Sequence, residues 1–166
     1  MGYEIAAGLG VKLAEPMRDV FVMVGDGSYL MMNSEIATSI ALGLKVIVIL
    51  LDNRGFGCIN RLQQGTGGKP FNNLLDSSAP QVDFAAHAAS LGAIAEKVGG
   101  IAELSAAIER AKSADRTSVI VIDTDPAAST KEGGAWWDVA VPEVSALETV
   151  RVARLSYEKA QKRQKI

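Results

Sequence analysis

The sequence predicts an α/β fold in which a central parallel sheet carries helices on both faces. Short, continuously apolar runs alternate with stretches of helical periodicity. A continuous apolar run is typical of a strand that is buried on both faces, as in parallel sheets. Repeated strand and helix order favours right-handed crossovers. Ligands of such folds bind beyond the carboxyl ends of the strands.

The first predicted helix covers residues 3–14. Ile5, Leu9 and Leu13 form an apolar stripe at helical spacing, and Pro16 ends the pattern. The stretch is rich in Ala and Gly, so we expect a helix that packs closely against its neighbours.

Two strands and a second helix are expected next. Val20–Val24 is a short apolar run that ends at Gly25, and Lys45–Leu51 is a second one. Between them, residues 34–42 have helical spacing, with Asn33 or Ser34 as the cap and Gly43 after the end. This segment therefore predicts a strand, helix, strand unit.

The same alternation continues toward the carboxyl terminus. Helices are expected at residues 83–91 and 101–111, and strands at 93–98 and 118–123. A last helix is expected at about residues 146–162, where terminal cations match the helix dipole.

Two segments do not fit this alternation. Residues 53–82 are rich in Gly, Asn, Gln and Pro and are too long for a simple connector, so we expect a functional loop or lid that is mobile without ligand. Residues 124–145 look irregular and contain the adjacent Trp136 and Trp137, either as anchors of the tail or as a wall over a pocket.

Composition narrows the class of protein. A length of 166 residues fits a single domain, with residues 126–166 as its tail and terminal helix. The net charge of −2 argues against nucleic acid as a partner. Cys58 is the only cysteine, which fits a reducing, cytoplasmic location. We expect no membrane segment, since the apolar runs are too short, and no signal peptide.

Candidate ligands for a divalent cation follow the first two strands. Asp26 comes directly after the first strand and Asn53 after the second, so the two should meet at one edge of the sheet. Carboxylate and amide oxygens suit Mg²⁺, which usually keeps phosphate oxygens among its ligands. Gly25 and Gly27 should let the backbone approach a diphosphate, and the hydroxyl of Ser28 should meet its charge.

Together, GDGS after one strand and DN after the next resemble the thiamine-diphosphate enzyme family. The resemblance implies thiamine diphosphate and Mg²⁺ as cofactors, with Asp26, Asn53 and the backbone carbonyl of Gly55 as metal ligands. The family usually has two asparagines in the second loop. Asp52 departs from that pattern, but it falls on a position that does not ligate.

Further cofactor contacts are implied by the same resemblance. Met1-Gly2-Tyr3 resembles the stretch whose methionine supports the bent cofactor, although Met1 could also be only a start residue. Phe56 and Gly57 in the second loop are expected to contact the cofactor too. Glu35 matches an acidic position of the motif, for which we expect a structural role in capping or orienting the turn.

A closer resemblance lies within this family, to hydrolases that open the ring of a cyclic trihydroxydione in inositol catabolism. It rests on DNRGFGCIN at residues 52–60, Leu62-Gln63, the tryptophan tail and Val144-Ser145. It implies a small cyclic polyol-dione as substrate, and a C-terminal part of a larger homo-oligomeric enzyme with separate pyrimidine-binding and middle domains.

The catalytic glutamate of the family lies on another domain, so no residue here is assigned a catalytic role and the isolated chain should be inactive. Two alternatives remain open: another thiamine enzyme, such as an acetolactate synthase-like carboligase or a 2-oxo acid or malonic semialdehyde decarboxylase, and a non-catalytic module that binds an anion. We expect structural roles for His87, a lone histidine in a helix, and for Cys58.

Overall fold

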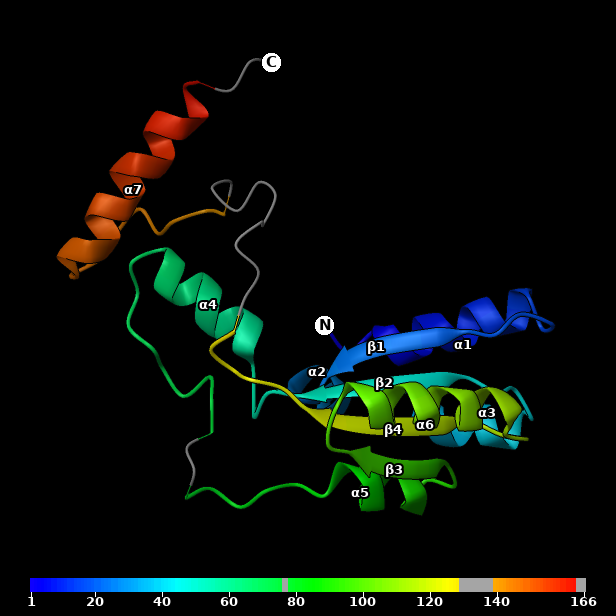
Figure 1. Ribbon diagram of the computed structural model, residues 1–166. Helices are drawn as coiled ribbons and strands as arrows, with labels where there is room; N and C mark the ends of the chain where they lie inside the picture. Colours follow the sequence, from blue (N-terminus) through cyan, green and yellow to red (C-terminus); the bar gives the residue numbers. More distant parts are fainter. Residues whose placement is uncertain (76–77, 129–138, 164–166) are drawn as a thin grey trace. The chain divides into compact units, whose positions relative to one another are not determined.

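The computed structural model describes residues 1–75, 78–128 and 139–163 (Figure 1). The described chain forms two compact units. Unit 1 comprises Met1–Phe56 and Leu75–Asp125, and unit 2 comprises Gly57–Leu74 and Pro126–Ile166. The expectation of one domain over residues 1–166 stays a prediction, as does the mobility of residues 53–82 without ligand.

Unit 1 is built on a four-stranded sheet. Its strands are β1 (Phe21–Gly25), β2 (Ile47–Asp52), β3 (Ile94–Val98) and β4 (Ser118–Asp123). They lie in the order β1-β2-β4-β3, and every neighbouring pair is parallel (Figure 1). The helices of unit 1 are α1 (Glu4–Ala14), α2 (Asp26–Met31), α3 (Glu35–Ala41), α5 (Phe84–Ser90) and α6 (Ile101–Ser113).

The sheet separates two apolar cores, which confirms the predicted fold class. On one face, alternate strand residues such as Val22 and Val48 join the inner faces of α1, α2, α3 and α5. On the other face, Ala107 and Ala111 of α6 pack against strand residues that include Ile120. Continuous apolar strands are needed because both faces of each central strand are covered.

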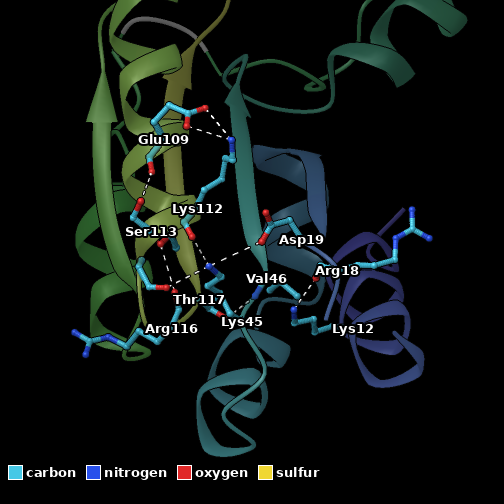
Figure 2. A network of polar contacts seen from close by, with 12 residues as sticks. Lys12, Arg18, Asp19, Lys45, Val46, Glu109, Lys112, Ser113, Arg116 and Thr117 are labelled. Carbon is cyan, nitrogen blue, oxygen red and sulfur yellow. Dashed lines mark hydrogen bonds and ion pairs between the residues drawn. The ribbon is translucent and has the colours of Figure 1, made fainter. Parts of the chain in front are cut away.

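Helix α1 packs closely on β1, as its small residues predict. A Cβ placed on Gly8 would overlap a methyl group of Val22, so only glycine fits there. The predicted stripe is wrong in one place, since Leu13 is 56 % exposed and Lys12 is buried instead. The aliphatic stem of Lys12 continues the inner face, and its ammonium donates to the carbonyl of Arg18 at 2.6 Å (Figure 2).

A polar network fastens the amino ends of the strands in unit 1. Lys45 Nζ donates to the carbonyl oxygens of Lys112, at 2.6 Å, and Ala114, at 3.2 Å, where α6 ends (Figure 2). The hydroxyls of Thr117 and the buried Ser39 lie 2.7 Å apart. These contacts hold the amino edge of the sheet, whereas the predicted site belongs to its carboxyl edge.

Unit 2 contains α4 (Gly57–Gly65) and α7 (Glu148–Gln161). The expectation of a functional loop or lid over residues 53–82 did not include the helix α4. Its middle consists of good helix formers, Arg61 to Gln64, whose propensity is masked in the sequence by the surrounding glycines. Gly67 follows α4 with φ +83°, and its carbonyl accepts from Thr149 Oγ1 at 2.6 Å.

Trp136 and Trp137 lie outside the described residues, so both predictions about them remain open. Among residues 1–75, 78–128 and 139–163, no helix is long and apolar enough to cross a membrane.

Candidate functional site

The turns that follow β1 and β2 lie side by side in unit 1. Gly25 at the end of β1 is paired in register with Leu51 of β2, so Asp26 comes level with the residues just after Leu51. The parallel register thus places Asp26 and Asn53 at one edge, as the sequence predicts.

Three oxygen-bearing groups converge there. One terminal atom of the Asn53 amide lies 3.1 Å from Asp26 Oδ1 and 2.8 Å from the carbonyl oxygen of Gly55. With its nitrogen turned inward, Asn53 donates to both oxygens, whereas with its oxygen inward it places a third oxygen next to those of Asp26 and Gly55. Adjacent ligands of octahedral Mg²⁺ are roughly 3 Å apart, given metal to oxygen distances of about 2.1 Å. The spacing fits a cation of that size.

Asp26 is held by the backbone of the second turn. It is only 3 % exposed, and its two carboxylate oxygens accept from the amides of Gly55, at 2.5 Å, and Asn53, at 3.4 Å. Burial raises the pKa of Asp26, the Gly55 amide opposes that shift, and the nearby charge of Asp52 adds to it. The ionised carboxylate is therefore disfavoured by its surroundings, and a cation would relieve this.

Two residues of the second turn have positive φ angles, which residues other than glycine rarely adopt. Arg54 has φ +62° and Gly55 φ +137°. Asp52 Oδ1 accepts from the amide of Arg54 at 2.9 Å, which stabilises the left-handed turn. Asp52 thereby helps to aim the carbonyl of Gly55.

The first turn differs from the expected loop, because α2 begins at Asp26 with Gly25 as its N-cap residue. Gly25 itself has φ −77°, an angle that other residues also adopt. A Cβ on Gly27 would lie 2.7 Å from the ring of Phe56 and 3.2 Å from the carbonyl of Gly55. Glycine is required at position 27 for close packing of the two turns, rather than for its dihedral angles.

Two of the remaining predicted contacts, Gly2 and Ser28, are hydrogen-bonded to each other. Gly2 is buried with φ +80°, and its amide donates to Ser28 Oγ at 2.7 Å. Met1 is 61 % exposed and Phe56 36 % exposed. Gly57 begins α4 and belongs to unit 2.

Sequence reasoning missed the partner of His87. Its Nδ1 lies 2.9 Å from the hydroxyl of Tyr29, which is fully buried in α2 just after the GDGS turn. A buried tyrosine hydroxyl needs a hydrogen-bond partner. The lone histidine in the helical stretch of α5 was the residue in the sequence that could have suggested this partner. Glu35 lies in the first turn of α3, but Ser34 at the N-cap makes no side-chain capping bond.

Among the residues that the structure describes, no group of three or more His, Cys, Asp or Glu side chains could hold a metal. A cation site here therefore depends on amide and carbonyl oxygens besides Asp26.

Comparison with known families decides the relationship. Residues 1–122 match the model described as thiamine pyrophosphate enzyme, C-terminal TPP binding domain. The chain belongs to this family. The matched region includes all of the sheet of unit 1 except Asp123, the last residue of β4, and both turns of the candidate site.

Curated relatives are more similar still. The chain is 41 % identical over 163 residues to 3D-(3,5/4)-trihydroxycyclohexane-1,2-dione hydrolase 2 of Bacillus cereus, with 92 % of the chain covered. It is 43 % identical over 162 residues to the hydrolase of that name from Bacillus licheniformis, with 96 % covered. In both comparisons the chain spans only 25 % of the relative.

Solved structures agree on the fold. Benzoylformate decarboxylase from Polynucleobacter necessarius superposes with a TM-score of 0.63 and 26 % identity, over 76 % of this chain and 23 % of that one. The thiamine diphosphate-dependent 4-hydroxybenzoylformate decarboxylase of Rhodococcus jostii gives the same TM-score at 24 % identity, over 75 % of this chain and 23 % of that one.

Proposed function

We propose that this thiamine pyrophosphate domain binds the diphosphate of its cofactor through Mg²⁺ held by Asp26, Asn53 and the carbonyl oxygen of Gly55. The observation that carries the proposal is the convergence of these groups, with separations of 2.8 and 3.1 Å around the Asn53 amide. The raised pKa of Asp26, caused mainly by burial, supports it because a cation offsets the cost of the charge.

The other predicted residues act as positioning and contact groups in this proposal. Gly27 allows the two turns to approach, and Phe56 covers that glycine. Met1, Gly2, Gly25 and Ser28 complete the set of proposed cofactor contacts in unit 1, and the predicted contact of Gly57, the first residue of unit 2, stays a prediction. When bound, thiamine diphosphate supplies a nucleophilic carbon and an electron sink for cleaving a bond next to a carbonyl. This chain's own part is to hold and orient the diphosphate end.

The rest of the site is proposed to come from other domains of the same protein, since the relatives are about four times as long as the matched region. The edge strand β1 exposes 46 % of Phe21 and 64 % of Met23, an apolar surface suited to contact with such domains. We assign no catalytic residue here and expect the isolated chain to be inactive and the whole protein to be a homo-oligomer.

For the whole protein we propose hydrolysis of a carbon–carbon bond in 3,5/4-trihydroxycyclohexane-1,2-dione, a step of inositol catabolism that adds one water and opens the ring. The identity of 41 to 43 % to enzymes of that name supports this substrate. A second candidate is a 2-oxo acid decarboxylase, which is favoured only by the likeness to benzoylformate decarboxylase at 26 % identity.

Calorimetric titration of thiamine diphosphate into this chain, with and without Mg²⁺, tests the proposed anchor. We expect Mg²⁺-dependent binding that Asp26→Ala and Asn53→Ala each abolish, because each removes a proposed ligand. Asp115→Ala removes an exposed carboxylate far along the chain and serves as the control. Binding that is independent of Mg²⁺, or that survives both substitutions, would contradict the metal site and favour a module that binds anions without a metal.

The whole enzyme separates the two candidate reactions. Purified protein loaded with thiamine diphosphate and Mg²⁺ is supplied with either the cyclic dione or benzoylformate, and products are followed by mass spectrometry and carbon dioxide release. If the protein is the proposed hydrolase, the product formed from the dione is heavier than the dione by the mass of one water, and no carbon dioxide is released. Release of carbon dioxide from the oxo acid alone would favour the decarboxylase.

A further inference from the structure

The hydroxyl of Ser28 is already engaged within the protein. It accepts from the amide of Gly2 at 2.7 Å and lies 2.8 Å from Glu4 Oε1, to which it donates. A serine hydroxyl has a single hydrogen to donate. Because that hydrogen points to Glu4, it is not directed at a diphosphate oxygen in this arrangement, contrary to the role that the sequence suggested for Ser28.

Glu4 is well suited to hold that hydrogen. Partial burial opposes its charge, but hydrogen bonds from its own amide and the Ser28 hydroxyl, the positive charge of the N-terminus and the nearby Gly2 amide prevail, so the pKa of Glu4 is lowered. The carboxylate also lies in the first turn of α1, where a negative charge is favoured by the helix dipole. Ser28 therefore donates to an ionised acceptor, which strengthens the bond.

This bridge joins segments that are far apart in the sequence. Ser28 is 26 positions from Gly2 and 24 from Glu4. Gly2 is held at φ +80° beside α2, where a Cβ would lie 3.1 Å from Cβ of Met31. The position thus needs both the left-handed backbone of glycine and a fixed acceptor for its amide.

We infer that Glu4 is a positioning residue of the cofactor site, acting through the Ser28 hydroxyl on the backbone of Gly2. The inference rests on the proposed function, in which residues 1–2 and 25–28 contact the same cofactor. Glu4 joins these two segments before any ligand arrives, so less ordering is needed on binding. Ser28 serves as the link between them.

The first test needs no cofactor. Amide hydrogen exchange of the ¹⁵N-labelled 166-residue chain reports on the Gly2 amide directly. We expect this amide to be protected in the parent chain and in Glu4→Gln, whose amide oxygen can still accept from Ser28, and to exchange at least roughly tenfold faster in Glu4→Ala and Ser28→Ala. Glu15→Ala, which removes an exposed carboxylate just after α1, is the control. Unchanged protection in Glu4→Ala would overturn the bridge.

The second test measures the dissociation constant of thiamine diphosphate in Mg²⁺ for the whole enzyme. Removal of residues that orient ligands typically weakens binding by about tenfold or more, so we expect that loss in Glu4→Ala and most of the affinity to return in Glu4→Gln. Equal affinity of Glu4→Ala and the parent would overturn the positioning role even if Gly2 exchange is faster. If the parent enzyme binds no cofactor, the proposed function fails and the positioning role with it, whereas the exchange result still decides the bridge.

Discussion

The hydroxyl of Tyr29 lies 2.9 Å from Nδ1 of His87, which ties α5 to α2, the helix that begins at Asp26. The rings of Tyr29 and Phe84 also meet edge to face, with centroids 5.6 Å apart. The fully buried phenol thus has a polar partner and an aromatic neighbour.

Tyr29 should make the fold sensitive to alkali. Burial raises the pKa of Tyr29 from 10.0 to about 12. A raised folded pKa favours the neutral phenol, so its contribution is fully present below pH 10 and is lost as pH rises through about 12. We expect the free energy of unfolding in urea to fall by about 2 to 3 kcal/mol across that window. Tyr29→Phe should remove that part of the fall.

Tyr3→Phe is the control for this measurement, because Tyr3 is 70 % exposed. At neutral pH, Tyr29→Phe should cost only about 1 kcal/mol, the usual value of one hydrogen bond. A Tyr29→Phe chain that loses as much stability in alkali as the parent would contradict the assignment.

Gly27→Ala should damage the candidate site. Its Cβ would lie 2.7 Å from two atoms of the Phe56 ring, so the ring or the turn must move. We expect a loss of roughly 1 to 3 kcal/mol in the free energy of unfolding, as for overpacked sites, together with weaker Mg²⁺-dependent binding of thiamine diphosphate. Urea unfolding and calorimetry measure the two effects.

Gly10→Ala is the matched control. Gly10 lies in α1 and is exposed, and a Cβ added to it would have no neighbouring atom within 4 Å. Alanine there should stabilise the chain by about 0.5 to 1 kcal/mol and leave cofactor binding unchanged. The packing explanation is wrong if Gly27→Ala behaves like Gly10→Ala.

Lys45→Met should destabilise the amino edge of the sheet. The ammonium donates to the carbonyls of Lys112 and Ala114 at the end of α6 and lies 4.0 Å from Asp19 (Figure 2). Methionine keeps the apolar stem but removes these charged bonds, so we expect a loss of about 1 to 2 kcal/mol in urea unfolding.

Lys112→Met tests whether the loss of any lysine near the end of α6 lowers the free energy of unfolding as much as Lys45→Met does. Its side chain pairs with Glu109 on the exposed surface of α6, an arrangement that contributes little. We expect a change below about 0.5 kcal/mol. Equal losses for the two variants would show that general charge, rather than the end of α6, is responsible.

Asp52→Asn should stabilise the metal-free chain. Burial is the main cause of the raised pKa of Asp26, and the charge of Asp52 adds to it. A raised folded pKa means that the Asp26 contribution is present below the ordinary value of 3.8 and is lost as pH rises through the folded pKa. Removing the Asp52 charge should therefore add up to about 1 kcal/mol at neutral pH.

This gain should disappear in acid, where the carboxyl group of Asp26 is protonated and carries no charge to be repelled. Asparagine can still accept from the amide of Arg54, so the turn should persist. Urea unfolding at neutral and acid pH measures the difference, with the exposed Asp115→Asn as control. A gain that is the same at both pH values would contradict repulsion between Asp52 and Asp26.

The sequence by itself determined the four strands, the helices other than α2 and α4, and the meeting of Asp26 with Asn53. Apolar runs and helical periodicity are local signals, and parallel pairing then brings the ends of β1 and β2 to one edge. The helix α4 was missed because its glycine-rich surroundings outweighed the propensity of its central residues.

Only the tertiary structure decided which atoms those residues face. Ser28 turned out to bond Glu4 and Gly2, Gly27 to face Phe56, and Lys12 rather than Leu13 to be buried in α1. Each outcome depends on residues distant in the sequence that arrive at one place in space. Such partners leave no periodic trace in the sequence, because the choice between them is made by packing and by the hydrogen bonds still unsatisfied once the chain has folded.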